Sequence, residues 1–171
     1  MNSPLAAIRI VSARLEDTEA IATMGKDIWH RCYFPDVLSI DAVAYLWQRT
    51  LSPSAVREEM ARGVRYEWIE QVSTRIGFLA WHHLAEQQRM RLNKLYLLPE
   101  YHGLGIGALA LTYIKEVAAQ LGVKEIYLYV FKKNRKAIRA YLKAGFIIAR
   151  EEVTDAGQGY CYDDYVMSYS L

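Results

Sequence analysis

Three alternate glycines stand in the middle of the chain, between an apolar segment and a helical pattern. Gly103, Gly105 and Gly107 remove side chains from the start of that pattern. The sequence predicts a strand at Arg89–Leu98 before the glycines and a helix that ends at about Leu121 after them. Backbone N–H groups at such a helix entrance can face a bound anion, and the helix dipole adds roughly half a positive charge there. The spacing therefore predicts a binding site for a phosphate or pyrophosphate.

The residues around the glycines indicate which class of phosphate site this is. A P-loop needs Lys and then Ser or Thr after its last glycine, whereas Gly107 is followed by Ala108 and Leu109. A dinucleotide-binding fold needs the glycine turn in its first strand-to-helix unit and an acidic residue about 20 residues later. Here the turn comes late, and the next strand runs into Phe131 and two lysines. For the glycines alone, an ordinary helix N-terminus explains the pattern equally well.

A second motif lies after the next predicted strand. Asn134 is a suitable N-cap, because its short side chain can accept a hydrogen bond from the first free N–H groups of a helix. Gly145 can supply the left-handed conformation that ends a helix. Between them, Tyr141 follows Asn134 at a spacing that puts both side chains on one helical face. The pattern predicts a helix that presents an amide and a phenol on the same side.

Taken together and in this order, the two motifs resemble the GNAT N-acetyltransferases. The glycine segment is similar to their coenzyme A loop, and Asn134–Phe146 is similar to their Asn-x6-Tyr-x-Lys-x-Gly-Phe helix. The resemblance is detailed from about Arg91 to Phe146. It implies an α/β fold in a single domain, residues 1–171. The implied sheet is mixed and mostly antiparallel, has about seven strands, is splayed between strands 4 and 5, and is flanked by helices.

The resemblance also implies where acetyl-coenzyme A (acetyl-CoA) binds. In the family, the pantetheine arm lies along the fourth strand, and the pyrophosphate meets the N–H groups of the glycine loop. The implied cofactor-binding residues are Leu95, Tyr96, Leu97, His102, Gly103, Leu104, Gly105, Ile106, Gly107, Ala108 and Asn134. The family usually has Gln or Arg where this chain has His102. This difference weakens any side-chain contribution to pyrophosphate binding but leaves the backbone amides.

Tyr141 is the implied catalytic acid, because the family's tyrosine at this place protonates the departing thiolate. The unperturbed pKa of a phenol is about 10, so Tyr141 is expected to be protonated at neutral pH. Structural roles stay open for both motif residues. Asn134 can be a helix cap alone, and Tyr141 can be a core aromatic residue.

No residue is assigned as the general base that must deprotonate an amine. Many family members have a glutamate on the fourth or fifth strand, whereas this chain has Arg91–Lys94 and Tyr129 in those places. Four titratable residues on the predicted second and third strands are candidates: Glu67, Glu70, His82 and His83. A chain of water molecules that ends at one of them is equally compatible with the sequence.

Composition limits the remaining possibilities. The chain has 171 residues, of which 53% are hydrophobic, and a net charge of +2. That length fits one domain, and the small charge gives no reason to expect nucleic-acid binding. Cys32 and Cys161 lack the spacing of a metal or redox site, and no metal is expected. No apolar run approaches the ~20 residues that cross a membrane, and no signal peptide is evident, which favours a cytoplasmic protein without membrane contact.

Two functions stay open at this point. The resemblance favours an acetyl-CoA-dependent N-acetyltransferase in which an amine attacks the thioester directly. The alternative is a non-catalytic acyl-coenzyme A binding or sensing module on the same fold. The acceptor is a small amine such as a polyamine, or a peptide or protein amine, since the likeness to polyamine acetyltransferases is generic. Tyr33 and Phe34, in a loop predicted at Arg31–Leu38, can shape an amine pocket, and a homodimer is compatible with the sequence.

Overall fold

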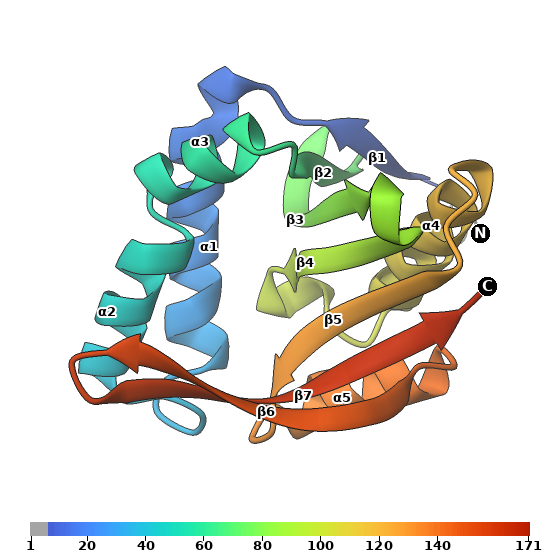
Figure 1. Cartoon of the computed structure of the whole chain (residues 1–171). Helices are drawn as coiled ribbons and strands as arrows, with labels where there is room; N and C mark the ends of the chain where they lie inside the picture. The colour runs from blue at the N-terminus through green and yellow to red at the C-terminus, as the bar shows by residue number, and fades with distance from the viewer. Residues whose placement is uncertain (1–6) are drawn as a thin grey trace. The chain divides into compact units, whose positions relative to one another are not determined.

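The computed structural model describes residues 7–171, which form seven β-strands and five α-helices (Figure 1). The strands are β1 Ile8–Ser12, β2 Arg65–Gln71, β3 Thr74–Leu84, β4 Arg89–Leu97, β5 Glu125–Phe131, β6 Ile147–Gly157 and β7 Tyr160–Ser170. The helices are α1 Thr18–Cys32, α2 Ile40–Thr50, α3 Pro53–Ala61, α4 Ile106–Gln120 and α5 Arg135–Lys143.

The seven strands follow the order β1-β2-β3-β4-β5-β7-β6 in one sheet. β2 pairs antiparallel with β1 and with β3, and β7 pairs antiparallel with β5 and with β6. β4 and β5 run parallel, and their ladder joins Arg89–Arg91 to Glu125–Tyr127, at the beginnings of both strands. The fold class predicted from the sequence, a mixed and mostly antiparallel sheet with helices, is confirmed.

Internal contacts divide the described chain into two compact units. One unit contains the described residues up to Trp81 together with Lys94–Ala110, and the other contains His82–Asn93 and Leu111–Leu171. Strands β3 and β4 and helix α4 have residues in both units. The single domain expected from the sequence stays a prediction.

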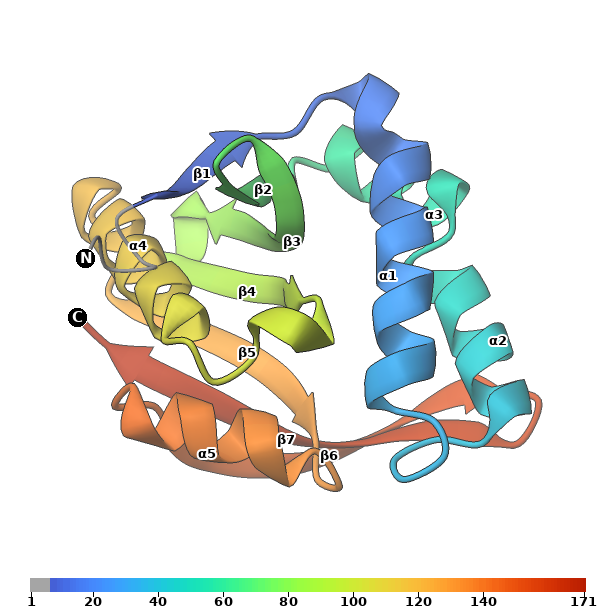
Figure 2. The same cartoon turned by 180° about the vertical axis from the view of Figure 1, so that it is seen from behind.

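In the first unit, α1 packs with α2 and α3 (Figure 2). The indole N–H of Trp47 on α2 donates to the carbonyl of Ala22 on α1 at 3.1 Å. Serine caps begin the two shorter helices, because the hydroxyls of Ser39 and Ser52 accept hydrogen bonds from N–H groups in the first turns of α2 and α3.

The end of α1 corrects the sequence prediction. α1 continues to Cys32, so Arg31 is helical, whereas a loop was predicted from Arg31 onwards. The N–H of Tyr33 donates to the carbonyl of Trp29 at 2.9 Å, and their rings meet edge-to-face with 5.5 Å between centroids. Pro35 suggested the loop, but a proline restricts only the residue before it. Packing of the buried Trp29 therefore sustains the last helical turn.

In the second unit, α5 and the part of α4 from Leu111 onwards lie on one face of β5 and β7 (Figures 1 and 2). β5 alternates between buried and half-buried residues, as a strand with one core face does. Lys115 of α4 donates a hydrogen bond to the carbonyl of Ala144, just after α5, and its Nζ lies 3.9 Å from the centroid of the Tyr169 ring. These contacts hold the two helices together over the strands.

No helix in residues 7–171 is both long and apolar enough to pass through a lipid bilayer. The same residues contain no group of three or more His, Cys, Asp or Glu side chains that could hold a metal ion.

Candidate functional site

The predicted phosphate loop lies in the first unit, between the end of β4 and the start of α4. A single 3-10 turn, Pro99–Tyr101, separates the strand from the glycines. Gly103 and Gly105 have φ angles of 77° and 81°, a left-handed conformation that side chains disfavour. The carbonyl of Gly105 accepts a hydrogen bond from the N–H of Leu109 at 3.0 Å and so begins α4. The next N–H groups therefore lie at the helix N-terminus, which favours anions.

The loop also leaves room beside its backbone. A Cβ atom on Gly103 would meet no heavy atom within 4 Å, and one on Gly107 would lie 3.9 Å from Cδ1 of Leu97. Residues 103–105 are exposed, whereas Ile106 is buried and anchors the first turn of the helix. An anion can thus approach the backbone amides while the helix start stays fixed.

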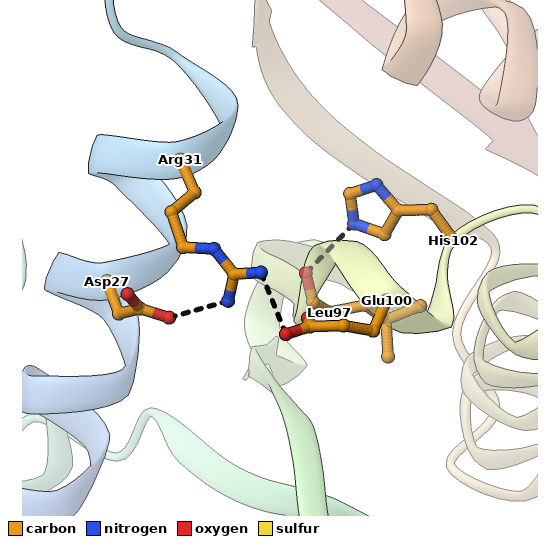
Figure 3. A network of polar contacts seen from close by, with 5 residues as sticks. All are labelled: Asp27, Arg31, Leu97, Glu100 and His102. Atoms are coloured by element: carbon orange, nitrogen blue, oxygen red, sulfur yellow. Dashed lines mark hydrogen bonds and ion pairs between the residues drawn. The ribbon is translucent and has the colours of Figure 1, made fainter.

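His102 contacts the end of β4. Its Nε2 lies 2.9 Å from the carbonyl oxygen of Leu97 (Figure 3). Because a carbonyl oxygen only accepts, Nε2 carries the hydrogen in this bond. The imidazole therefore holds the last residue of β4 against the loop that follows it.

Arg31 connects the end of α1 to the same loop (Figure 3). Its guanidinium nitrogens lie 3.1 Å from Oδ2 of Asp27 and 2.8 Å from Oε1 of Glu100. The hydrogen bond from Arg31 holds the pKa of the Glu100 carboxyl below its usual range, and the bonds to Glu100 and Asp27 raise the pKa of the guanidinium. All three side chains are exposed, so the pairs add little stability and act mainly by fixing where the loop lies.

The end of β4 is shaped by Gly77 on β3. A Cβ atom at Gly77 would lie 2.3 Å from the carbonyl oxygen of Tyr96, a distance that no side chain tolerates. Glycine therefore permits a close approach of the two strands here. Beyond it, the N–H of Leu98 donates to the carbonyl of Ile76 at 2.9 Å. Together these contacts fix Leu95–Leu97, the residues predicted to lie along the pantetheine arm.

The side chain of Tyr96 belongs to an aromatic cluster in the first unit. Its ring centroid lies 5.4 Å from that of Phe78, 6.4 Å from that of Trp29 and 6.5 Å from that of Tyr33. Tyr33 thus joins the end of α1 to β4, whereas Phe34 beside it is 43% exposed. A role of these residues in an amine pocket stays a prediction.

Asn134 begins α5 in the second unit. Its Oδ1 accepts a hydrogen bond from the N–H of Ala137 at 3.1 Å, which confirms the predicted cap. Gly145 follows the helix with a φ of 89°, the left-handed conformation expected after a helix end. The predicted contact of Asn134 with the cofactor stays a prediction.

Tyr141 is half-buried on the same helix. Its ring packs edge-to-face on Phe146, with 5.8 Å between centroids. Burial raises the pKa of its hydroxyl to about 12, so the phenol is protonated throughout the physiological pH range. The predicted cofactor loop thus lies in the first unit, and both motif residues of α5 lie in the second.

Two of the four candidate bases have structural partners. Glu67 is 7% exposed and accepts a hydrogen bond from the Trp81 indole N–H at 2.8 Å. Glu70 lies 3.5 Å from an arginine of β1. His82 and His83 are half-buried near the end of β3.

Sequence reasoning missed a buried carboxylate on β7. Asp164 is 9% exposed, and burial raises the pKa of its carboxyl to about 6. The charges of Asp163 and Glu152 also raise this pKa, whereas Arg91 and Lys132 oppose the shift. The consecutive acids at 163 and 164 could have indicated it, because one of two consecutive residues on a strand must face inward.

Comparison with known proteins identifies the family. The model of the acetyltransferase (GNAT) family matches residues 26–146, which contain both motifs. The chain belongs to the GNAT family. The family predicted from the sequence is thereby confirmed.

Relatives of this GNAT chain include an uncharacterized N-acetyltransferase of Mycobacterium tuberculosis, 38% identical over 86 residues. That match covers 50% of this chain and 54% of the mycobacterial protein, so the chain spans about half the length of such relatives. Spermidine N(1)-acetyltransferase of Thermoplasma acidophilum is 25% identical over 154 residues, 87% of this chain and 94% of that protein. Among solved structures, PaiA N-acetyltransferase of T. acidophilum in complex with coenzyme A has a TM-score of 0.79 and 25% identity, and covers 96% of this chain and 99% of its own.

Proposed function

We propose that the protein is an acetyl-CoA-dependent N-acetyltransferase that transfers acetyl to an amine by direct attack on the thioester. The observation that carries this proposal is the family match over residues 26–146, which includes the glycine loop and the Asn134–Tyr141 helix. The likeness to a spermidine acetyltransferase and to a PaiA structure with bound coenzyme A, each over most of the chain, supports it.

The residues of the first unit fit the acetyl donor, which supplies an activated thioester. Backbone N–H groups from Gly103 to Ala108 are proposed to bind its pyrophosphate, because they precede and begin α4 and the loop leaves room beside them. Leu95–Leu97 are proposed to bind the pantetheine arm through their backbone. His102 donates to the Leu97 carbonyl, so pyrophosphate binding is assigned to the amides rather than to this side chain.

Tyr141 is proposed to give its proton to the thiolate that leaves. A pKa of about 12 keeps the hydroxyl protonated at neutral pH. Apolar surroundings also raise the pKa of a thiol, so a thiolate beside Tyr141 would be a stronger base than in water. Burial thus preserves the proton on Tyr141 and increases the tendency of the leaving sulfur to take it.

The proposed acceptor is a small amine, with a polyamine favoured. Support comes from the relative named spermidine N(1)-acetyltransferase, which matches 87% of this chain. Peptide and protein amines are the other candidates. A cytoplasmic location and a homodimer stay predictions.

An acetyl-CoA consumption assay tests the proposal. The protein is mixed with acetyl-CoA and, in turn, with polyamines, amino acids and peptides, and both thiol release and the acetylated product are measured. We expect turnover with at least one amine. Binding of acetyl-CoA without turnover of any amine would overturn the proposal in favour of the non-catalytic acyl-coenzyme A module.

A variant of the loop tests the cofactor site. Acetyl-CoA should raise the Tm of the wild type, because it binds only the folded protein. Gly107→Val should remove most of this shift, since its branched side chain would enter the space beside the loop. Ala119→Val, at an exposed position of the same helix, is the control and should keep the shift. A full shift in Gly107→Val would show that the loop is misassigned.

A further inference from the structure

One face of the strands in the second unit carries polar groups. Directly paired strand residues point to the same face of a sheet. Phe131 on β5 pairs with Asp164 on β7, which in turn pairs with Glu152 on β6. Tyr129 shares this face because it lies two residues before Phe131. The guanidinium carbon of Arg91 on β4 lies 4.7 Å from the centroid of the Tyr129 ring and extends the face.

Helices α4 and α5 lie on the opposite face. Tyr169 pairs with Ile126, whose neighbours at alternate positions, Leu128 and Val130, are buried. Lys115 of α4 lies over the ring of Tyr169. The polar face is therefore the face of these strands that turns away from α4 and α5.

Two side chains on the polar face, Asp164 and Asn93, carry acceptor oxygens that lack hydrogen-bond donors. Asp164 is nine-tenths buried, and no hydrogen bond or ion pair reaches its carboxylate from any of residues 7–171. On β4, the Oδ1 atom of Asn93 is buried and likewise has no partner among the described residues. Asn93 lies two residues after Arg91 and so shares its face. The buried Nε of Arg91, a donor on the same face, also has no partner among the described residues. Because buried polar groups are nearly always hydrogen-bonded, the Asn93 oxygen together with the unpartnered Asp164 carboxylate indicates a ligand that brings N–H donors to this face.

Arg150, a second arginine on this face, is already engaged. Arg150 binds Glu152 at 2.8 Å and also hydrogen-bonds to Tyr129. Asp164 is left next to a second carboxylate, and although the charges of Arg91 and Lys132 act on it, neither forms an ion pair with it. A primary ammonium group supplies both a positive charge and three N–H donors, and therefore complements this arrangement.

We propose that Asp164 receives the ammonium group of the acceptor amine on this polar face and takes the proton that must leave before attack. The proposal rests on the proposed acetyltransferase function and adds the base that the sequence did not reveal. No other group on this face combines nine-tenths burial with a carboxylate that lacks a partner among residues 7–171.

The Asp164 carboxylate takes one proton from R–NH₃⁺, and the nitrogen lone pair forms a bond to the carbonyl carbon of the thioester. The C–S bond breaks, and Tyr141 gives its proton to the leaving sulfur. The nitrogen loses its second proton to water, Tyr141 regains a proton from water, and Asp164 releases the first proton to water. The products are the N-acetyl amine, coenzyme A thiol and one proton.

The electrostatics of the site suit this role. A pKa of about 6 makes Asp164 a stronger base than an ordinary aspartate, and the carboxyl is still ionised at pH 7. The charged and titratable groups of the unit that face or influence it are Glu152, Asp163, Arg91, Lys132, Arg150 and Tyr129.

Two neighbouring variants test the assignment. Asp164→Asn should lower kcat with the preferred amine by about 10²–10⁴-fold at pH 7, because one proton-transfer role is lost. Acetyl-CoA should still raise its Tm. The loss should shrink towards pH 9, where more of the amine is already neutral. Glu151→Gln, on the exposed face of the neighbouring strand, is the control and should keep kcat within about twofold. An Asp164→Asn enzyme with wild-type turnover, or with an equal loss at both pH values, would overturn the proposal.

Direct binding separates this proposal from the proposed function. If the wild type turns over no amine of the panel, the acetyltransferase function fails, and calorimetry with spermidine in the presence of coenzyme A then tests Asp164 alone. We expect Asp164→Asn to bind spermidine at least about tenfold more weakly than the wild type and than Glu151→Gln, since a charge-assisted bond is lost. Equal binding by all three proteins, or no binding to the wild type, would overturn the assignment of Asp164.

Discussion

Two sets of carboxylates, Glu151 with Asp163 and Glu152 with Asp164, occupy consecutive positions of β6 and β7 and face opposite sides of this hairpin. Glu151 and Asp163 both bind Lys132, at 2.8 Å and 2.6 Å, and their side chains are 66% and 54% exposed. Glu152 and Asp164 pair on the other face, where Asp164 is 9% exposed. The same residue types, in consecutive positions of the same strands, thus meet opposite conditions.

The difference shows how to separate structural charges from functional ones. The exposed pair raises the pKa of Lys132, but its ion pairs are in water and contribute little to stability. At Asp164, burial and the neighbouring carboxylates disfavour the charged form. A carboxylate that is kept buried without a partner lowers stability, and such sites are typical of binding or catalysis.

Cationic side chains on the two faces of the strands also differ in their hydrogen-bond partners. On the helix face, Lys115 lies over the Tyr169 ring and also donates to the Ala144 carbonyl. On the polar face, Arg91 lies over the Tyr129 ring, but its buried Nε has no hydrogen-bond partner among residues 7–171. Lys115 therefore has a hydrogen-bond acceptor on the helix face, whereas the buried Nε of Arg91 has none on the polar face among residues 7–171.

The largest expected effect comes from the hydroxyl of Tyr141, on the helix that covers the helix face. If Tyr141 is the acid for the thiolate, Tyr141→Phe should lower kcat by about 10²–10⁴-fold while acetyl-CoA still raises the Tm. Measuring kcat beside Tm checks this, because a purely structural tyrosine would lower Tm and leave turnover per folded molecule unchanged. Tyr165→Phe on β7 is a control and should keep kcat. A fully active but less stable Tyr141→Phe protein would contradict the role.

A smaller effect is expected at Lys115, which positions α5. Phe146 links the two, since its ring contacts Tyr141 at 5.8 Å and Lys115 Nζ lies 5.8 Å from its centroid. Lys115→Met keeps the stem but removes the hydrogen bond to the end of α5. We expect a loss of about 1–2 kcal/mol of unfolding free energy, a Tm lower by roughly 3–6 °C, and kcat lower by about tenfold. Lys115→Arg should recover part of kcat. Unchanged kcat despite a lower Tm would show that Lys115 serves stability alone.

Local chemistry made much of the fold predictable from the sequence. The caps at Ser39, Ser52 and Asn134 depend on side chains that bond to N–H groups a few residues away. The glycine loop was predictable for the same reason, since Gly103 and Gly105 adopt the left-handed conformation that glycine permits.

Features that depend on contacts between distant segments were not predictable. The last turn of α1 is sustained by Trp29, which packs on Tyr96 from β4. Asp164 is buried on a strand that pairs with β5 and β6, and only this register shows which of two consecutive aspartates faces which side. A sequence shows that two acids are adjacent, but not which of them lacks a cation.

The free energy of unfolding at pH 7 should rise in Asp164→Asn and fall in Asp163→Asn. A raised pKa means that the ionised form of Asp164 destabilises the fold. The protonated carboxyl therefore contributes its full stability below about pH 4, and this contribution is lost as the pH rises through about 6. One pKa unit corresponds to about 1.4 kcal/mol, and the unpartnered amide of the new asparagine offsets part of the gain. Asp164→Asn should therefore raise the free energy of unfolding by about 1–2 kcal/mol at pH 7. The gain should vanish at pH 4. Asp163→Asn should instead lose less than about 1 kcal/mol, because it removes an exposed ion pair. Thermal unfolding of both variants at pH 4 and 7 measures this, and a lower Tm for Asp164→Asn at pH 7 would contradict the view that the buried charge lowers stability.

The smallest expected effect comes from Glu152, the residue that makes the two pairs unlike. Glu152→Gln removes the like charge opposite Asp164 and releases Arg150 from its carboxylate partner. Both changes favour ionised Asp164 and should lower its pKa. If Asp164 is the base, the acid limb of the kcat/KM profile should move from about pH 6 to lower pH by roughly half a unit. Glu151→Gln, on the exposed face, should move it much less, because solvent screens that charge. An acid limb that stays in place in Glu152→Gln would mean that a group other than Asp164 titrates in the reaction.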